Sequence, residues 1–223
     1  MERVRNFLNN LPKTNNLGEE ITLVGATKTV DADKIKQAFD HGILHVGENK
    51  VQEFLQKFND YPREATLHFI GHLQTNKVKQ LVGKVNLIQS VDSLKLLNEI
   101  NECALKQNIT QDILLEVNIA NDQNKHGFLK EEIINAVSQA KLLPCVKVLG
   151  LMTVLPKCEN KEKLCKLCLQ MRNLYDIIKE SNPSFRYLSM GMSGDYETAI
   201  KNGSNMIRIG SLLFGDRDYG EKG

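Results

Sequence analysis

Two apolar runs near the end of the chain each change abruptly into glycine and serine. Tyr187-Leu188 leads into Ser189, and Met206–Ile209 leads into Gly210-Ser211. Small residues after a buried strand let backbone N–H groups approach an anion closely, and the N-terminus of a following helix adds a favourable dipole. The two stretches therefore predict the two halves of a phosphate-binding cup, although two ordinary turns would give the same pattern.

A lysine near the other end of the chain could face this cup. Lys28 follows the apolar run 21–26, where a solvated lysine is not expected. Removing water from a lysine beside another cation lowers its pKa and makes the amine nucleophilic, although a strand-end lysine can also keep its head in water. A lysine opposite a phosphate cup could bind a ligand that has an aldehyde at one end and a phosphate ester at the other. Pyridoxal 5′-phosphate (PLP) is the cofactor of that shape.

Arg208 lies one pleat before Gly210 on the same expected strand. Its guanidinium could reach the ring nitrogen of a bound pyridoxal. A permanent cation there disfavours a protonated pyridinium and so weakens the ring as an electron sink. A phosphate clamp, or an ion pair with Asp195 or Asp216, remains an alternative role for this arginine.

The elements that must position these residues alternate between strand-like apolar runs and segments of helical periodicity. Such alternation predicts parallel βα units, and eight units predict a closed (β/α)8 TIM-type barrel of the α/β class. An open doubly wound sheet is the rival, but no GxGxxG follows the first strand. The expected strands are 21–26, 43–46, 67–70, 85–89, 113–119, 146–154, the residues around Leu188, and 206–209.

The composition narrows the class of protein. With 223 residues and a formal net charge of +2, the chain fits one domain over 1–223 and carries no charge excess typical of nucleic-acid binding. We expect no membrane span and no secretory signal, because the apolar runs are strand-sized. The five cysteines are an odd number, which favours a reducing compartment and a cytoplasmic protein over a disulfide framework.

Metal-binding patterns are weak in the sequence. Cys165 and Cys168, with Cys158 upstream, lie in or near a segment of helical periodicity, and no second pair completes a tetrahedral set. His68 and His72 flank an expected strand, but no carboxylate or third histidine is spaced to complete a site. We therefore expect no metal.

Six motifs occur in an order that resembles a known family. They are Thr27-Lys-Thr29, Gly47-Glu-Asn-Lys-Val-Gln-Glu53, His68-Phe-Ile-Gly-His-Leu-Gln-Thr-Asn-Lys77, Gly150-Leu-Met-Thr153, Ser189-Met-Gly-Met-Ser193 and Arg208-Ile-Gly-Ser-Leu-Leu-Phe-Gly215. Over essentially the whole chain, this order is similar to that of the YggS/PROSC family of PLP homeostasis proteins. The resemblance implies the alanine-racemase-type barrel (PLP fold type III) without its second, β-rich domain. It also implies PLP held as an internal aldimine, a role in vitamin B6 and amino-acid homeostasis, and no robust catalysis.

The resemblance also assigns seven residues to the cofactor site. They are Lys28 as the Schiff-base lysine, Arg208 at the ring nitrogen, Asn49 beside the ring, Met152 in the pocket wall, and Ser189, Gly210 and Ser211 at the phosphate. Two further lysines stay open: Lys50, where the family often has tyrosine, adds an amine near the site, and Lys125 lies in a Lys-x-Gly loop that could give a secondary contact.

The function that follows is a PLP carrier or regulator, with PLP-dependent apo-enzymes as candidate recipients, acting as a monomer or weak dimer. An amino-acid racemase is the alternative. It needs a base on each face of the cofactor, and Lys28 supplies only one. Tyr187 and Tyr196 are weak candidates for the second base, and 223 residues leave no room for the domain that usually provides it. A barrel for another phosphorylated metabolite is a third reading.

Overall fold

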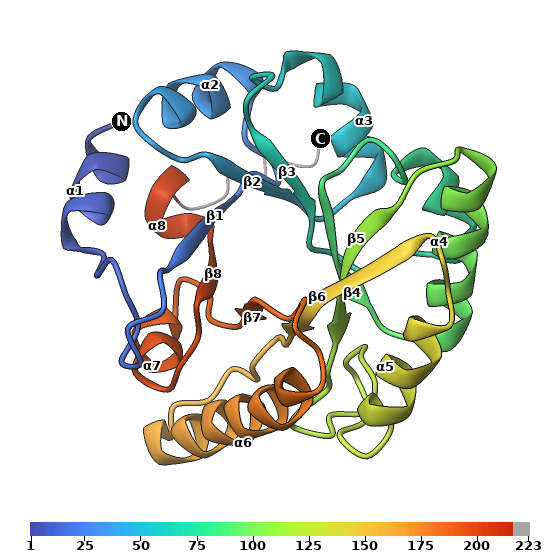
Figure 1. Cartoon of the computed structure of the whole chain (residues 1–223). Helices are drawn as coiled ribbons and strands as arrows, with labels where there is room; N and C mark the ends of the chain where they lie inside the picture. Colours follow the sequence, from blue (N-terminus) through green and yellow to red (C-terminus); the bar gives the residue numbers. More distant parts are fainter. Residues whose placement is uncertain (216–223) are drawn as a thin grey trace.

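Eight parallel strands close into a barrel in the computed structural model, which describes residues 1–215 (Figure 1). Each strand pairs with the next along the chain, and the last pairs with the first through the register Val24 to Arg208. The strands are β1 Thr22–Ala26, β2 His45–Glu48, β3 Thr66–Phe69, β4 Leu87–Val91, β5 Gln111–Glu116, β6 Val146–Met152, β7 Tyr187–Ser189 and β8 Met206–Ile209.

Helices surround the barrel and cover the outward faces of its strands (Figure 1). Three of them begin at side-chain caps, because Asp31, Ser93 and Asn160 each accept a bond from a backbone N–H three residues later. The helices are α1 Glu2–Asn10, α2 Ala32–Asp40, α3 Val51–Lys57, α4 Leu94–Lys106, α5 Ile133–Lys141, α6 Lys161–Glu180, α7 Tyr196–Lys201 and α8 Ser211–Phe214, with 3-10 turns η1 Phe58–Asp60 and η2 Thr75–Gln80.

Side chains alternate between the two faces of each strand, so the apolar residues form one core between the strands and the helices and another inside the barrel. Outward residues such as Ile207 pack against the helices, whereas the inward Met206 joins a small apolar cluster inside the barrel with Val24 and Met152. Polar inward residues lie above that cluster, toward the carboxyl ends of the strands. This end of a (β/α)8 barrel carries the βα loops and the active sites of enzymes with this fold.

The predicted barrel is confirmed, and the open sheet is excluded by the β1–β8 pairing. Several boundaries differ from the predictions by two or more residues; the strand expected at 85–89, for example, is β4 Leu87–Val91. The sequence pattern of 75–82 predicts a helix, but residues 75–80 form the 3-10 turn η2. The strand expected to reach Ile119 ends at Glu116 because Val117 pairs only as an isolated bridge with Phe128. Residues 216–223, including Asp216 and the end of the predicted single domain, lie outside the described residues.

Within 1–215, no helix has the length and apolar character to cross a membrane.

Gly150 gives a test of how closely β6 and β7 approach each other. It has φ of +150°, and a Cβ at this position would overlap the carbonyl oxygen of its β7 partner Tyr187. We predict that Gly150→Ala lowers the unfolding free energy by more than about 3 kcal/mol in a denaturant titration. The matched change Gly194→Ala meets no atom within 4 Å and should alter it by less than about 0.5 kcal/mol. Equal effects of the two variants would contradict this account.

Candidate functional site

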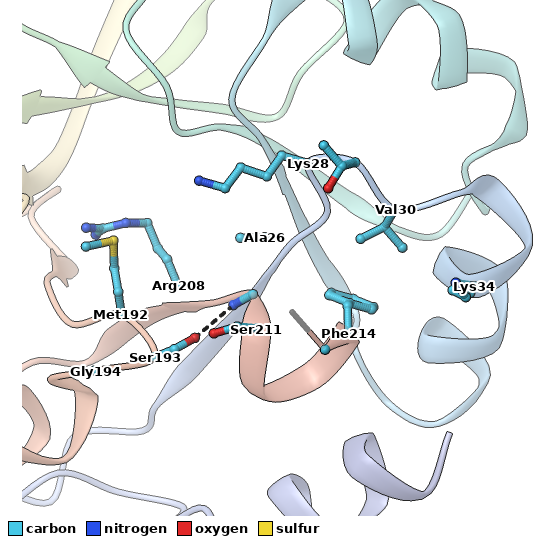
Figure 2. Close-up of a pocket in the computed structure, with 13 residues that line it drawn as sticks. Ala26, Lys28, Val30, Lys34, Met192, Ser193, Gly194, Arg208, Ser211 and Phe214 are labelled. Carbon is cyan, nitrogen blue, oxygen red and sulfur yellow. Dashed lines mark hydrogen bonds between the residues drawn. The ribbon is translucent and has the colours of Figure 1, made fainter. Parts of the chain in front are cut away.

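A cavity of about 320 Å³ opens at the carboxyl end of the barrel, between the loop after β1 and the loops after β7 and β8. Its size falls in the range of small-ligand pockets, roughly 300–1,000 Å³. It gathers four of the seven residues that the sequence assigned to the site, namely Lys28, Arg208, Gly210 and Ser211. Figure 2 shows the extended side chain of Lys28 on one side of the cavity, with Ser193 and Ser211 on the other.

The loop that carries Lys28 is held on both sides of the lysine. The hydroxyl of Thr27 donates to Glu48 Oε1 at 2.7 Å, and Lys57 Nζ donates to the carbonyl oxygen of Thr27 at 2.9 Å. The backbone N–H of Thr29, which has φ of +63°, donates to Glu53 Oε1. Bonds on each side of Lys28 thus fix the backbone from which its amine extends.

Lys57 joins the two carboxylates of this network. Its Nζ lies 3.1 Å from Glu48 Oε1 and 2.6 Å from Glu53 Oε1, and Tyr61 also donates to Glu48 at 2.9 Å. Burial raises the pKa of Glu48, while the charge of Lys57 and the bonds from Thr27 and Tyr61 oppose that rise. The buried carboxylate therefore depends on the lysine for its only close positive charge among these partners.

Two turns of small residues line the cavity, one after β7 and one after β8. Ser193 and Gly194 form the turn before α7, and Gly210 and Ser211 form the start of α8. The backbone N–H of Gly210 donates to Ser193 Oγ at 3.3 Å, which joins the two turns (Figure 2). In the described chain, the backbone N–H groups of Ser193 and Gly194 donate to no protein acceptor. These small residues with available donors fit a phosphate group.

Arg208 heads a hydrogen-bonded chain that crosses the barrel interior. Its Nη1 donates to Ser189 Oγ at 2.6 Å, and the Ser189 hydroxyl donates to Gln89 Oε1 at 2.7 Å. Gln89 Nε2 contacts His68 Nδ1 at 2.9 Å, and His68 Nε2 contacts His45 Nδ1 at 3.0 Å. A second bond, from Arg208 Nη2 to the Thr153 carbonyl oxygen at 2.8 Å, fixes the plane of the guanidinium.

The direction of every bond in this chain follows from Arg208, because a guanidinium can only donate. Ser189 must accept from it and so donates onward, which leaves the Gln89 amide nitrogen to face His68. His68 Nδ1 is then the acceptor, and its proton is on Nε2. Burial first, and the neighbouring His45 second, lower the pKa of His68 to about 3, and burial also lowers the pKa of His45. Both rings therefore stay neutral, and Arg208 carries the only charge in this row of hydrogen-bonded side chains.

Acidic groups near the cavity offset the charge of this arginine. Burial lowers the pKa of Arg208 to about 10, and Glu116 and Asp195 act against that shift. Burial, helped by the charge of Asp92, raises the pKa of Glu116 to about 7, against the effect of Arg208 and Lys125. Arg208 is therefore cationic at neutral pH.

Three of the seven predicted site residues do not line the cavity. Ser189 is fully buried and its hydroxyl is engaged by Arg208 and Gln89, since β7 turns this side chain into the barrel. Met152 belongs to the apolar cluster inside the barrel, and Asn49 has a buried, unpartnered Oδ1 and is absent from the cavity lining. Ser193, four residues later, lines the cavity where Ser189 does not, and the phosphate contact expected for Ser189 stays a prediction.

The sequence did carry a signal for Ser193 and Gly194. Both belong to the stretch from Ser189 to the start of α7 at Tyr196, in which glycine and serine recur. Because β7 ends at Ser189, the loop and not the strand end reaches the cavity.

The two lysines left open take different places. Lys50 is exposed and immediately precedes α3. Lys125 Nζ donates to the Val154 carbonyl oxygen at 3.0 Å, and burial lowers the pKa of this lysine. Neither is among the residues that line the cavity.

The histidines at β3 also differ from the sequence expectation. His68 belongs to the buried chain described above, whereas His72 meets Asp92 and His126 at the mouth of the barrel. The expectation that no carboxylate or third histidine could complete a set with His72 is wrong, because the two partners come from other βα loops.

The network at Lys57 predicts a stability effect. Lys57→Met leaves the carboxylate of Glu48 buried without its cation and should lower the unfolding free energy by about 3 kcal/mol in urea. Adding Glu48→Gln removes the uncompensated charge and should restore a large part of the loss. A double variant as unstable as Lys57→Met would show that charge compensation is not what Lys57 contributes.

The row of buried hydrogen bonds from Arg208 to His68 predicts a single tautomer for His68. Two-dimensional ¹⁵N NMR of the folded protein should show His68 with a bare Nδ1 and a protonated Nε2. A pKa of about 3 lies below the ordinary value of 6.5, so this spectrum should not change between pH 8 and pH 5. The unfolded protein in denaturant serves as the control and should titrate normally. A cationic His68 in the folded protein at pH 5 would exclude the proposed bond directions.

Comparison with known proteins places this geometry in a family. Residues 5–218 match the family model "Alanine racemase, N-terminal domain". The pyridoxal phosphate homeostasis protein of Aquifex aeolicus is 43% identical over 199 residues, which cover 88% of this chain and 87% of that protein. The human protein of the same name is 35% identical over 219 residues, covering 90% and 78%.

Solved structures agree with this placement. PipY of Synechococcus elongatus, solved with PLP bound, has a TM-score of 0.83 and 29% identity, covering 96% of this chain and 99% of its own. An alanine racemase of Clostridium difficile has a TM-score of 0.77 at 16% identity and shows the fold alone; the chain covers 61% of it. The chain therefore belongs to the family of pyridoxal phosphate homeostasis proteins, which is built on the alanine racemase N-terminal barrel.

Proposed function

We propose that this protein binds PLP in the cavity at the mouth of the barrel and serves PLP homeostasis. The observation that carries the proposal is the placement of the Lys28 amine opposite the two glycine–serine turns, across a cavity of about 320 Å³. Two comparisons support it: relatives at 32–43% identity are named pyridoxal phosphate homeostasis proteins, and PipY was solved with PLP bound.

Lys28 is the residue that attaches the cofactor. PLP, when bound, supplies an aldehyde on an electron-withdrawing ring. Lys28, whose side chain lines the cavity, would hold the cofactor through that aldehyde, because a primary amine is the group with which an aldehyde condenses reversibly. The bonds on either side of Lys28, at Thr27 and Thr29, fix the backbone from which its side chain reaches the cavity.

The two turns hold the phosphate. Ser193 and Gly194 present backbone donors from one side, and Gly210 and Ser211 present small side chains and the start of α8 from the other. Ser211 and Ser193 each add a hydroxyl. A phosphate held at these turns would leave the rest of the cofactor in the cavity that Arg208 also lines.

Arg208 keeps the bound cofactor from acting as a strong catalyst. Its guanidinium is cationic and is held by Ser189 and Thr153, so it can donate to the ring nitrogen but cannot accept a proton from it. A ring nitrogen that stays unprotonated withdraws electrons weakly, which suits storage or transfer of PLP better than carbanion chemistry.

Racemisation is the weaker reading of the same cavity. It requires a second base facing Lys28. Neither tyrosine considered from the sequence lines the cavity: Tyr196 bonds Glu197 at 3.3 Å and packs on Phe7, and Tyr187 packs under Arg186. The names of the relatives support homeostasis and not racemisation.

The cellular setting belongs to the same proposal. The five cysteines are free, as suits a reducing compartment, and we place the protein in the cytoplasm with PLP-dependent apo-enzymes as recipients. A carrier of this kind needs no nucleic-acid partner and no membrane, and it can act as a monomer or weak dimer.

Attachment at Lys28 is tested by reducing the protein with borohydride in the presence of PLP and mapping the labelled peptide. The wild-type chain should carry one reduced adduct, on Lys28. Lys28→Ala should lose the adduct and the visible absorbance of the bound cofactor while keeping its circular dichroism and melting temperature. The matched control Lys50→Ala removes the other amine of this region and should label like the wild type. A folded Lys28→Ala protein that still yields a reduced adduct would overturn the assignment.

A further inference from the structure

Three side chains outside the cavity meet at the mouth of the barrel on three neighbouring loops. His72 follows β3, Asp92 directly follows β4, and His126 lies in the loop after β5. One ligand atom from each lies within 4.8 Å of the other two. None of the three lines the cavity that holds Lys28. We call them the His–Asp–His cluster.

The cluster is arranged around one carboxylate oxygen. His72 Nδ1 lies 3.0 Å from Asp92 Oδ2, and His126 Nδ1 lies 3.7 Å from the same atom. The two imidazole rings stack with centroids 3.6 Å apart and an interplanar angle of 10°. Only the His72 contact has the length of a hydrogen bond, so the His126 nitrogen faces the carboxylate without bonding to it.

These separations match those of ligands around a single metal ion. Zinc binds imidazole nitrogen and carboxylate oxygen at about 2.0–2.2 Å, which in a tetrahedron puts two ligand atoms about 3.3 Å apart. The distances of 3.0 and 3.7 Å lie on either side of that value.

The exposure of the three side chains allows the small adjustment that a metal requires. Asp92 is 10% exposed, whereas His72 and His126 are 41% and 55% exposed. The nitrogen lone pairs of stacked rings lie in two parallel planes, so one ring must tilt for both to meet one ion. The more exposed His126 has room to do so.

We propose that the His–Asp–His cluster is a binding site for a divalent transition metal of the zinc class. Two imidazoles and one carboxylate are a ligand set that zinc accepts, and solvent at the two exposed histidines leaves a fourth position for water. The site is distinct from the PLP cavity, and its existence does not depend on the proposed function.

Titration of the chelator-treated full chain with Zn²⁺ by calorimetry, and with Co²⁺ by visible absorption, tests the site. We expect one saturable site, with the absorption of a four- or five-coordinate cobalt and no thiolate charge-transfer band. His72→Gln and His126→Gln should each weaken Zn²⁺ binding by about tenfold or more. His41→Gln should leave it unchanged, since His41 ends α2 at the opposite end of the barrel.

A second measurement needs no variant. Addition of Zn²⁺ to the wild-type protein should shift the imidazole ¹⁵N resonances of His72 and His126 and leave those of His41 and His68 in place. No saturable binding, binding with a thiolate band, or unchanged resonances of His72 and His126 would each overturn the proposal.

Discussion

The inability of a guanidinium to accept a hydrogen bond organises the interior of this barrel. Arg208 is buried near the carboxyl ends of the strands and donates to Ser189, and from there each bond direction is determined as far as His45 at the start of β2. A buried cation with unpaired donors would be costly, so the chain of acceptors is a condition for placing the arginine there. Glu116 and Asp195 supply the opposing charge at longer range.

The opposite wall of the cavity is constrained by a separate network. Lys28 lies between two anchored residues, and the anchors lead to the buried carboxylate of Glu48 and to Lys57. The backbone at Thr29 is in the left-handed region, a conformation that its bond to Glu53 helps to hold. Lys28 and the buried cation Arg208 are thus held by different strands, β1 with β2 on one side and β7 with β8 on the other. The closure of the barrel through β1 and β8 brings them to the same cavity.

Much of this arrangement was predictable from the sequence. The alternation of apolar runs and helical segments predicts the barrel, and strand-end position predicts that Lys28, Arg208, Gly210 and Ser211 meet. The role of Ser189 was not predictable, because whether the last residue of a strand faces the cavity or the interior depends on pleat register, and a shift of one residue reverses it. The His–Asp–His cluster was hidden for another reason: its residues lie on three loops, and only the barrel places them together.

A structure of the full chain soaked with PLP tests the central claim most directly. The account predicts continuous density from Lys28 Nζ to the cofactor, the phosphate between Ser193-Gly194 and Gly210-Ser211, and the ring nitrogen facing Arg208 with the Arg208–Ser189 bond intact. A phosphate bound elsewhere, or a ring nitrogen directed away from Arg208, would contradict it.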